Sequence, residues 1–284
     1  MLTSVQLGAL ASDQLQALTT SQLRALSGEQ LASLSSDDLN ALSASQLASL
    51  STTRLAALTT SQLQAMGSDE LQALTTDQVR GLTTAQIAAM QSDDINLLTG
   101  DQIAAMGTAQ IRAIETADID NLGASGLAGL TTGQMAALST RQLGALASDQ
   151  LNVLTASQLA GLTTAQIASL ATDDLNQLTA TQFQNLSTRQ IAALGSDQVA
   201  GLESDDLMAL GSAQIRALDT VDIAALDTAD FANLSGSQLS GMSSTPLRAI
   251  VSPDITATTP LAFSGLTSAQ IASLATEQIA ALGS

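Results

Sequence analysis

The chain has 284 residues and a formal net charge of −18, and it contains no Cys, His, Trp, Tyr or Lys. Without Cys it has neither a disulfide framework nor a thiolate zinc site. The negative charge argues against nucleic acid and anionic membrane surfaces as partners, because both are bound through basic patches.

One eight-residue pattern runs from Thr3 to Leu282 without insertion or deletion and gives 35 octads. Position 5 of the octad is apolar in all 35, and position 8 is apolar in 34, with Thr258 as the exception. In one continuous α-helix these positions would drift by about 80° per octad, and a strand would need alternation. Because a spacing of three is one helical turn, we expect one short helix per octad, then a corner. The pattern therefore predicts an all-α solenoid whose core is built from positions 5 and 8.

The polar half of the octad predicts where each helix begins. Position 4 is Gln, Asp or Glu in 31 of 35 octads, and position 1 is usually Ser or Thr, as in Thr75 and Gln78. This is the capping box, in which the two side chains satisfy free N–H groups of the first turn. In eight octads the residue at position 1 is a poor cap, and we expect the Ser or Thr at position 2 to cap the helix instead. The position-1 residues of these octads are Ala11, Gln91, Glu115, Ala147, Ala171, Glu203, Val251 and Ala275.

Small residues at position 7, such as Ala73 and Gly81, favour a close backbone approach to a neighbouring coil. The alternative is that Ala simply forms helices well. The eight Arg residues scatter over the octads, and we expect them on solvated corners.

In chain order, residues 3–242 are regular octads, of which 123–130 has lost its Gln and gained Gly, so we expect a looser coil there. Residues 243–266 are degenerate octads of the same solenoid, with three prolines in expected first turns, and 267–282 return to the regular pattern. No apolar run is long enough for a transmembrane helix, and no signal peptide is recognisable. Both ends lie inside the array, which indicates a fragment of a longer array.

A second period places acidic octads at intervals of three and four, which indicates about 3.3 to 3.5 octads per coil. These octads would form an acidic ridge along one side. Its Asp-Asp pairs offer hard oxygen ligands of the kind that Ca²⁺ takes, although no EF-hand loop is present. The alternative is that Asp in a first helical turn complements the helix dipole. The candidate metal ligands are Asp37, Asp38, Asp93, Asp94, Asp173, Asp174, Asp205 and Asp206.

Catalysis has little support in the sequence. There is no His or Cys, the Ser residues are explained as caps, and the paired carboxylates repeat along the chain instead of converging. We therefore expect no enzyme and no cofactor, with Ca²⁺ at the ridge as the one ion left open.

The string Leu-Thr-Thr-Asp-Gln-Val at 74–79 resembles the start of a transcription-activator-like effector repeat, but the period and charge disagree, so DNA reading is not expected. The string Leu-Thr-Thr-x-Gln-Ile-x-Ala-Leu, nearly matched at 82–90 and 162–170, resembles octapeptide tracts of very large bacterial surface or secreted proteins of adhesin-like or haemolysin-like type. The resemblance implies an extracellular or cell-surface spacer or scaffold that stacks on neighbouring repeats and is not inserted in a membrane. The alternative is an adhesin-type or Ca²⁺-dependent binding rod that uses the acidic ridge.

Overall fold

A computed structural model describes residues 3–282, and within them each of the 35 octads forms one short helix, 34 of α type and one of 3-10 type. The predicted all-α solenoid is confirmed. The chain forms two compact units, one ending at Leu146 and the other beginning at Ala147. No helix in the described range is both long and apolar enough to cross a lipid bilayer.

The helices of the first unit are α1 (Ser4–Leu7), α2 (Ser12–Gln16), α3 (Thr20–Ala25), α4 (Gly28–Ala32), α5 (Ser36–Asn40), α6 (Ala44–Ala48), α7 (Thr52–Leu55), α8 (Thr60–Gln64), α9 (Ser68–Ala73), α10 (Thr76–Gly81), α11 (Thr84–Ala88), α12 (Ser92–Leu97), α13 (Gly100–Ala105), α14 (Thr108–Ala113), η1 (Ile119–Asn121), α15 (Ala124–Gly129), α16 (Thr132–Ala137) and α17 (Thr140–Leu143).

The helices of the second unit are α18 (Ser148–Asn152), α19 (Ala156–Gly161), α20 (Thr164–Ser169), α21 (Thr172–Leu175), α22 (Ala180–Asn185), α23 (Thr188–Ile191), α24 (Ser196–Ala200), α25 (Ser204–Ala209), α26 (Ser212–Ile215), α27 (Thr220–Ala225), α28 (Thr228–Asn233), α29 (Gly236–Gly241), α30 (Ser244–Ala249), α31 (Ser252–Ala257), α32 (Pro260–Phe263), α33 (Ser268–Ser273) and α34 (Thr276–Leu282).

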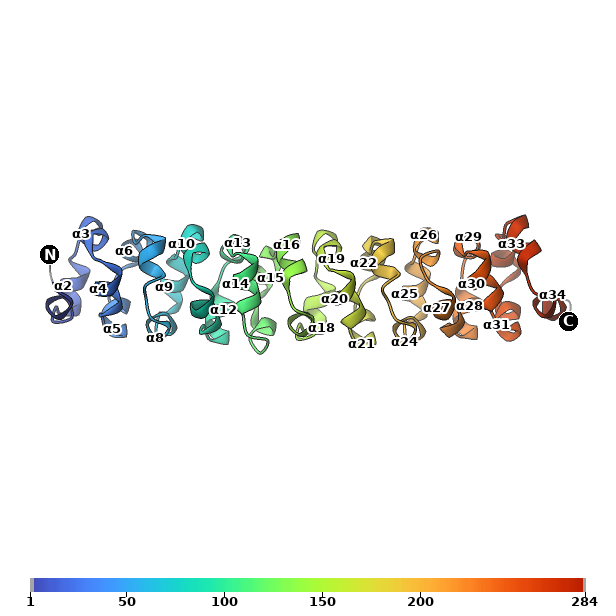
Figure 1. The fold of residues 1–284 in the computed structure, drawn as a ribbon, viewed down its shortest axis with the longest axis horizontal. Coiled ribbons are helices and arrows are strands. Elements are labelled where there is room, and N and C mark those ends of the chain that lie inside the picture. The colour runs from blue at the N-terminus through green and yellow to red at the C-terminus, as the bar shows by residue number, and fades with distance from the viewer. Residues whose placement is uncertain (1–2, 283–284) are drawn as a thin grey trace. The chain divides into compact units, whose positions relative to one another are not determined.

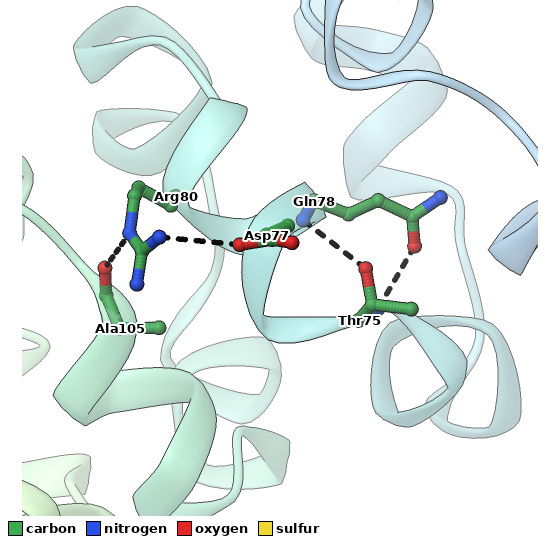
Figure 2. A network of polar contacts seen from close by, with 5 residues as sticks. All are labelled: Thr75, Asp77, Gln78, Arg80 and Ala105. Atoms are coloured by element: carbon green, nitrogen blue, oxygen red, sulfur yellow. Dashed lines mark hydrogen bonds and ion pairs between the residues drawn. The ribbon is translucent and has the colours of Figure 1, made fainter.

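The helices begin as the capping pattern predicts. In α10 the Thr75 hydroxyl accepts from the Gln78 backbone N–H at 3.2 Å, and Gln78 Oε1 accepts from the Thr75 N–H at 2.8 Å (Figure 2). Each such cap satisfies N–H groups that a helix start otherwise leaves free, and losing one costs about 1 kcal/mol.

The expected caps at position 2 are wrong in six octads, where the position-1 residue remains the N-cap and makes no side-chain cap bond. These position-1 residues are Ala11, Gln91, Ala147, Ala171, Glu203 and Val251. At Ala11 the other half of the capping box remains, since Gln14 Oε1 accepts from the Ala11 N–H at 3.0 Å. The position-2 hydroxyl of Ser92 instead donates to Asp118, one coil further on.

The corners between helices need no special residue. Helix α10 closes with the Leu82 N–H donating to the Val79 carbonyl at 3.2 Å. Leu82 and Thr83 are then extended, with φ/ψ of −62°/143° and −75°/156°, and the next helix follows. Within residues 3–282 no residue, glycine included, has a positive φ. Glycine is therefore not selected here for backbone conformation.

Positions 5 and 8 form the core, as predicted. Leu47 and Leu50, which hold these positions in one octad, are 0% and 3% exposed, and Phe183 and Phe231 fill position 5 at 0% and 1%. Full burial of such a side chain contributes roughly 1.5–3 kcal/mol. The polar exception, Thr258, is also buried, and its hydroxyl donates to the Asp254 carbonyl at 3.4 Å.

Successive coils contain between three and four octads. In the first unit α3, α6, α10 and α13 follow one another along one edge (Figure 1), in steps of three and four octads. In the second unit α19, α22, α26 and α29 do the same. Packing agrees, because α10 contacts α7 and α13, each three octads away. The steps in each unit average about 3.3 octads, which agrees with the predicted 3.3 to 3.5 octads per coil.

The expected loose coil at 123–130 is wrong. That octad forms the regular helix α15, which packs closely against α13. The irregular octad is the one before it, where a turn leads into the 3-10 helix η1. Further on, the prolines of 243–266 stand in the first turns of α30, α31 and α32, which keep the octad frame.

Position 7 does mark close backbone approach. A Cβ added at Gly81 would lie 2.6 Å from Thr52 Cβ, and one added at Gly129 would overlap the backbone of Gly100. In both cases position 7 of one octad meets position 2 of the octad three earlier. The small residue there leaves room for two coils to touch.

We expect Gly129→Ala to lower the thermal midpoint of the chain, because the new methyl group has to push α15 away from α13. Overpacking of this kind costs about 1–3 kcal/mol. The matched control is Gly133→Ala in α16, where an added Cβ meets nothing within 4 Å. That variant should keep or slightly raise the midpoint, since Ala forms helices better than Gly. Equal midpoints for both variants in circular-dichroism melts would contradict the close-approach explanation.

Candidate functional site

The Gln at position 4 does more than cap its own helix. In α11 the Gln86 side chain is 2% exposed, and its Oε1 accepts from the Thr83 N–H at 2.9 Å. Its Nε2 donates to the carbonyls of Leu55 and Leu58, both at 2.9 Å. One amide therefore starts a helix and joins it to the coil four octads earlier.

This arrangement recurs, and we call it the glutamine ladder: a position-4 Gln whose Nε2 donates to the carbonyls 31 and 28 residues earlier. Its members within single units are Gln46, Gln62, Gln78, Gln86, Gln102, Gln110, Gln134, Gln142, Gln182, Gln190, Gln198, Gln214, Gln238, Gln270 and Gln278. At Arg54 a guanidinium replaces the amide, and its Nε donates to the Leu26 carbonyl at 2.6 Å.

Some side chains at position 6 bond to a later coil, in the direction opposite to the glutamine ladder. Arg80 Nε donates to the Ala105 carbonyl at 3.2 Å, while Arg80 Nη1 forms an ion pair with Asp77 Oδ1 at 3.1 Å (Figure 2). The same bond across 25 residues is made by Arg24, Asn40, Gln64, Arg112, Asn176 and Arg216. Arg24, Arg80, Arg112 and Arg216 are exposed, as expected for solvated positions, and their guanidinium groups in addition join one coil to the next.

The predicted metal ligands lie as pairs in the first turns of α5, α12, α21 and α25. The first acid of each pair is exposed and the second, at position 4, is buried or half-buried. Among residues 3–282 no three His, Cys, Asp or Glu side chains gather where they could hold a metal ion. The structure thus brings each pair together but adds no third acid, and cation binding at the ridge stays a prediction.

In the pairs of α5 and α12 the second acid takes the capping role of the Gln. Asp38 Oδ2 accepts from the Ser35 hydroxyl at 2.6 Å, and Asp94 Oδ2 accepts from the Gln91 N–H at 3.1 Å. An Asp side chain is too short to reach the coil four octads earlier and has no N–H to donate. Burial raises the pKa of Asp94, with the Gln91 N–H acting against it and Asp93 adding to it.

Some position-4 acids are tied to the preceding coil by a hydroxyl. Thr228 donates to Asp254 at 2.6 Å, and Ser204 donates to Asp230 at 3.3 Å. Each of these bonds joins position 2 of one octad to position 4 of the octad three further on. Asp230 and Asp254 are therefore part of the contacts between successive coils.

Asp206 is the exception among the ridge acids. It is 7% exposed, and its Oδ2 has no hydrogen-bond partner. The N–H that it would normally accept, that of Glu203, instead donates to Asn176 Oδ1 at 3.4 Å. Burial, and then the charges of Glu203 and Asp205, raise the pKa of Asp206 to about 6.

Sequence reasoning missed the inter-coil half of the glutamine ladder, although a signal existed. Position 4 is Gln in 22 octads and Glu in one. Glu and Gln both serve in a capping box, so the preference for the amide pointed to a use for its N–H donors.

No curated protein matches the chain. The crystal structure of the leucine-rich repeat-containing protein LegL7 from Legionella pneumophila aligns at 11% identity over 90% of this chain and 79% of that one. Its TM-score of 0.18 carries no argument about the fold.

The model of the ALTTAQ repeat matches seven times, at 20–52, 52–84, 76–108, 111–148, 135–172, 167–202 and 199–235. These matches cover well over half of the chain and coincide with the regular octads. The protein belongs to the ALTTAQ repeat family and is a structural repeat module.

Proposed function

We propose that this repeat module is an extended spacer or scaffold of a large bacterial surface or secreted protein, and that it has no enzymatic activity. The observation that carries the proposal is the glutamine ladder. It uses the amides of position 4 to join each coil to the coil four octads earlier, as in the bonds from Gln86 to Leu55 and Leu58. Side chains of this kind, which bind ligands in other proteins, here hold the solenoid together.

Charge and context support the same proposal. A net charge of −18 disfavours nucleic acid and anionic membranes as partners. The partners that we propose are neighbouring repeats of a longer array, in an extracellular or cell-surface location. In such a module the exposed acids serve to keep a Leu-rich array from aggregating.

The second candidate is a Ca²⁺-dependent binding rod of adhesin type, and one observation favours it. Asp206 Oδ2 is buried without a partner, and Glu203 and Asp205 lie on the same helix start. A buried carboxylate without a donor is a group that a cation would satisfy.

A thermal melt followed by circular dichroism at about pH 7.5 separates the two candidates. For a spacer we expect the same midpoint without divalent ion, with millimolar Ca²⁺ and with Mg²⁺ as control. The matched variant carries Asp93→Asn, Asp173→Asn, Asp205→Asn and Asp206→Asn, which keep the shape and remove charge. A midpoint that rises with Ca²⁺ alone, and loses this rise in the variant, would contradict the spacer and support the binding rod.

A further inference from the structure

The glutamine ladder is thin in one part of the second unit. Of octads 28 to 33, which cover residues 219–266, one carries a ladder member, Gln238. The position-4 residues of the other five are Asp222, Asp230, Pro246, Asp254 and Ala262. None of these side chains has an amide N–H that could donate to the coil four octads earlier. We call residues 219–250, which carry α27 to α30, the sparse section.

A ladder amide bridges every junction between its own octad and the octad four earlier. Three amides bridge the junction between α21 and α22, namely those of Gln182, Gln190 and Gln198. In the described part of the second unit, the three successive junctions between α26 and α29 are bridged by one ladder amide. It is that of Gln238, which donates to the Leu207 carbonyl at 2.9 Å. The coils of the sparse section are therefore joined to earlier coils by fewer bonds than the coils around α22.

Other side chains do not replace the missing amides. Arg216 Nε donates to the Gly241 carbonyl at 3.1 Å across the same three junctions. The position-6 bond of Asn176, at 2.9 Å, crosses the junction between α21 and α22 in the same way, so it favours neither region. The hydroxyl bonds to Asp230 and Asp254, at 3.3 and 2.6 Å, supply one bond each where a ladder Gln supplies two.

The sparse section also has weaker helix ends. In α10 the Leu82 N–H closes the helix by donating to the Val79 carbonyl at 3.2 Å. The corresponding N–H of Leu226, after α27, makes no backbone bond in the structure. At the start of α30, Ser243 makes no side-chain cap bond, because Pro246 at the third helical position has no N–H to donate. Two of the four helices therefore lack a bond that most other octads have.

The acids of the sparse section lower its stability further. Asp222 and Asp230 are 5% and 6% exposed. Each accepts the N–H of an N-cap residue that is itself an acid, Asp219 or Asp227. Burial raises the pKa of Asp222 and of Asp230, while the N-cap N–H acts against this rise and the N-cap carboxylate adds to it. Folding therefore disfavours the ionised forms of these carboxyl groups, a penalty that a neutral Gln in the same place does not have.

We propose that the sparse section is an extension joint of the solenoid: its coils separate and unfold while residues 179–202 stay folded, and the chain lengthens there. Four octads of fully extended chain span on the order of 100 Å. The opening depends on contacts inside the second unit, so it holds whether or not the module is a spacer. In a spacer under tension, lengthening begins at this section.

The test is hydrogen exchange of residues 1–284 at neutral pH, followed by mass spectrometry of peptides from 219–250 and from 179–202. A hydrogen-bonded backbone N–H exchanges when its segment opens, so the rates report local opening. We expect the sparse section to exchange at least about tenfold faster, since each ladder bond changes the opening equilibrium by about fivefold.

Restoring the ladder should close the section. Asp230→Gln with Asp254→Gln adds two ladder amides, which between them bridge all three junctions from α26 to α29. We expect exchange in 219–250 to slow by at least about tenfold. The matched control, Asp197→Gln with Glu277→Gln, removes the same charge at exposed position-3 sites of α24 and α34, where no ladder bond forms. It should leave exchange in 219–250 unchanged.

The converse comparison removes ladder donors and keeps the caps. Gln238→Glu deletes the one ladder amide of the sparse section, whereas Gln190→Glu deletes one of three around α22. We expect a large increase of exchange in 219–250 for the first and a smaller increase in 179–202 for the second. Equal exchange of both segments in the parent chain would overturn the proposal. A control pair that slows exchange as much as the restored pair, or exchange that rises steadily toward residue 282 in every variant, would do so as well.

Discussion

Gln86→Ala should destabilise the chain by about 2–4 kcal/mol. The substitution removes two bonds to buried carbonyls and leaves the Thr83 N–H without its acceptor. A net contribution of about 1 kcal/mol per bond, with a further penalty for buried groups left unpaired, gives this range. The measurement is the urea midpoint by circular dichroism.

Gln22→Ala is the matched control, since Gln22 makes the same cap bonds to Thr19 and no ladder bond. It should cost about 1 kcal/mol, the usual value of a cap. The difference between the two variants measures the inter-coil bonds alone. If both lose the same stability, the ladder contributes nothing and the Gln is only a cap. Gln86→Glu keeps the acceptor and removes the donors, and should resemble the alanine variant near neutral pH.

Asp206→Gln should stabilise the chain by about 1–3 kcal/mol near neutral pH, against the usual direction of a substitution at a buried site. It removes a buried carboxylate without a partner on Oδ2. It also restores an amide whose ladder acceptors, 31 and 28 residues earlier, are the carbonyls of Leu175 and Leu178. Asp206→Asn should give part of the gain, because it removes the charge but does not reach that coil. Asp205→Asn, an exposed site on the same helix, should change little.

The gain should depend on pH in a defined direction. The pKa of Asp206 is raised from 3.8 to about 6 in the folded chain, mainly by burial. The protonated form is therefore favoured by folding, so this contribution is fully present below pH 3.8 and is lost as pH rises through about 6. Partial exposure of the neighbouring charges keeps the effect on the order of 1–2 kcal/mol. Melts from about pH 4 to 7 should show this loss in the parent chain and not in Asp206→Gln, and parallel profiles would contradict it.

The architecture could be predicted because a strict period fixes it. Positions 5 and 8 had only one way to be buried, as Leu47 and Leu50 are, and the capping box fixed each helix start. The close approach at Gly81 followed from its small size. Even the number of octads per coil was available from the spacing of the acidic octads.

The contacts between coils could not be read in the same way. A bond such as that from Gln86 to Leu55 joins groups 31 residues apart, and the cap had already explained the Gln. The unpaired Oδ2 of Asp206 depends on Asn176 in another coil, which takes the N–H of Glu203. The irregular octad before α15 also escaped prediction, since its sequence keeps the acid at position 4, Asp118. These features depend on which octads become neighbours and at what distance.

The side-chain hydrogen bonds that join coils within each unit span 25 to 31 residues, as in the links from Arg80 to Ala105 and from Gln78 to Leu47. Each newly made coil therefore finds its partner groups in chain that was synthesised only moments before. Chains dominated by such short-range contacts fold rapidly. A nascent polypeptide of this type can thus fold from its first coils onward as it emerges, one coil at a time, without waiting for its distal end.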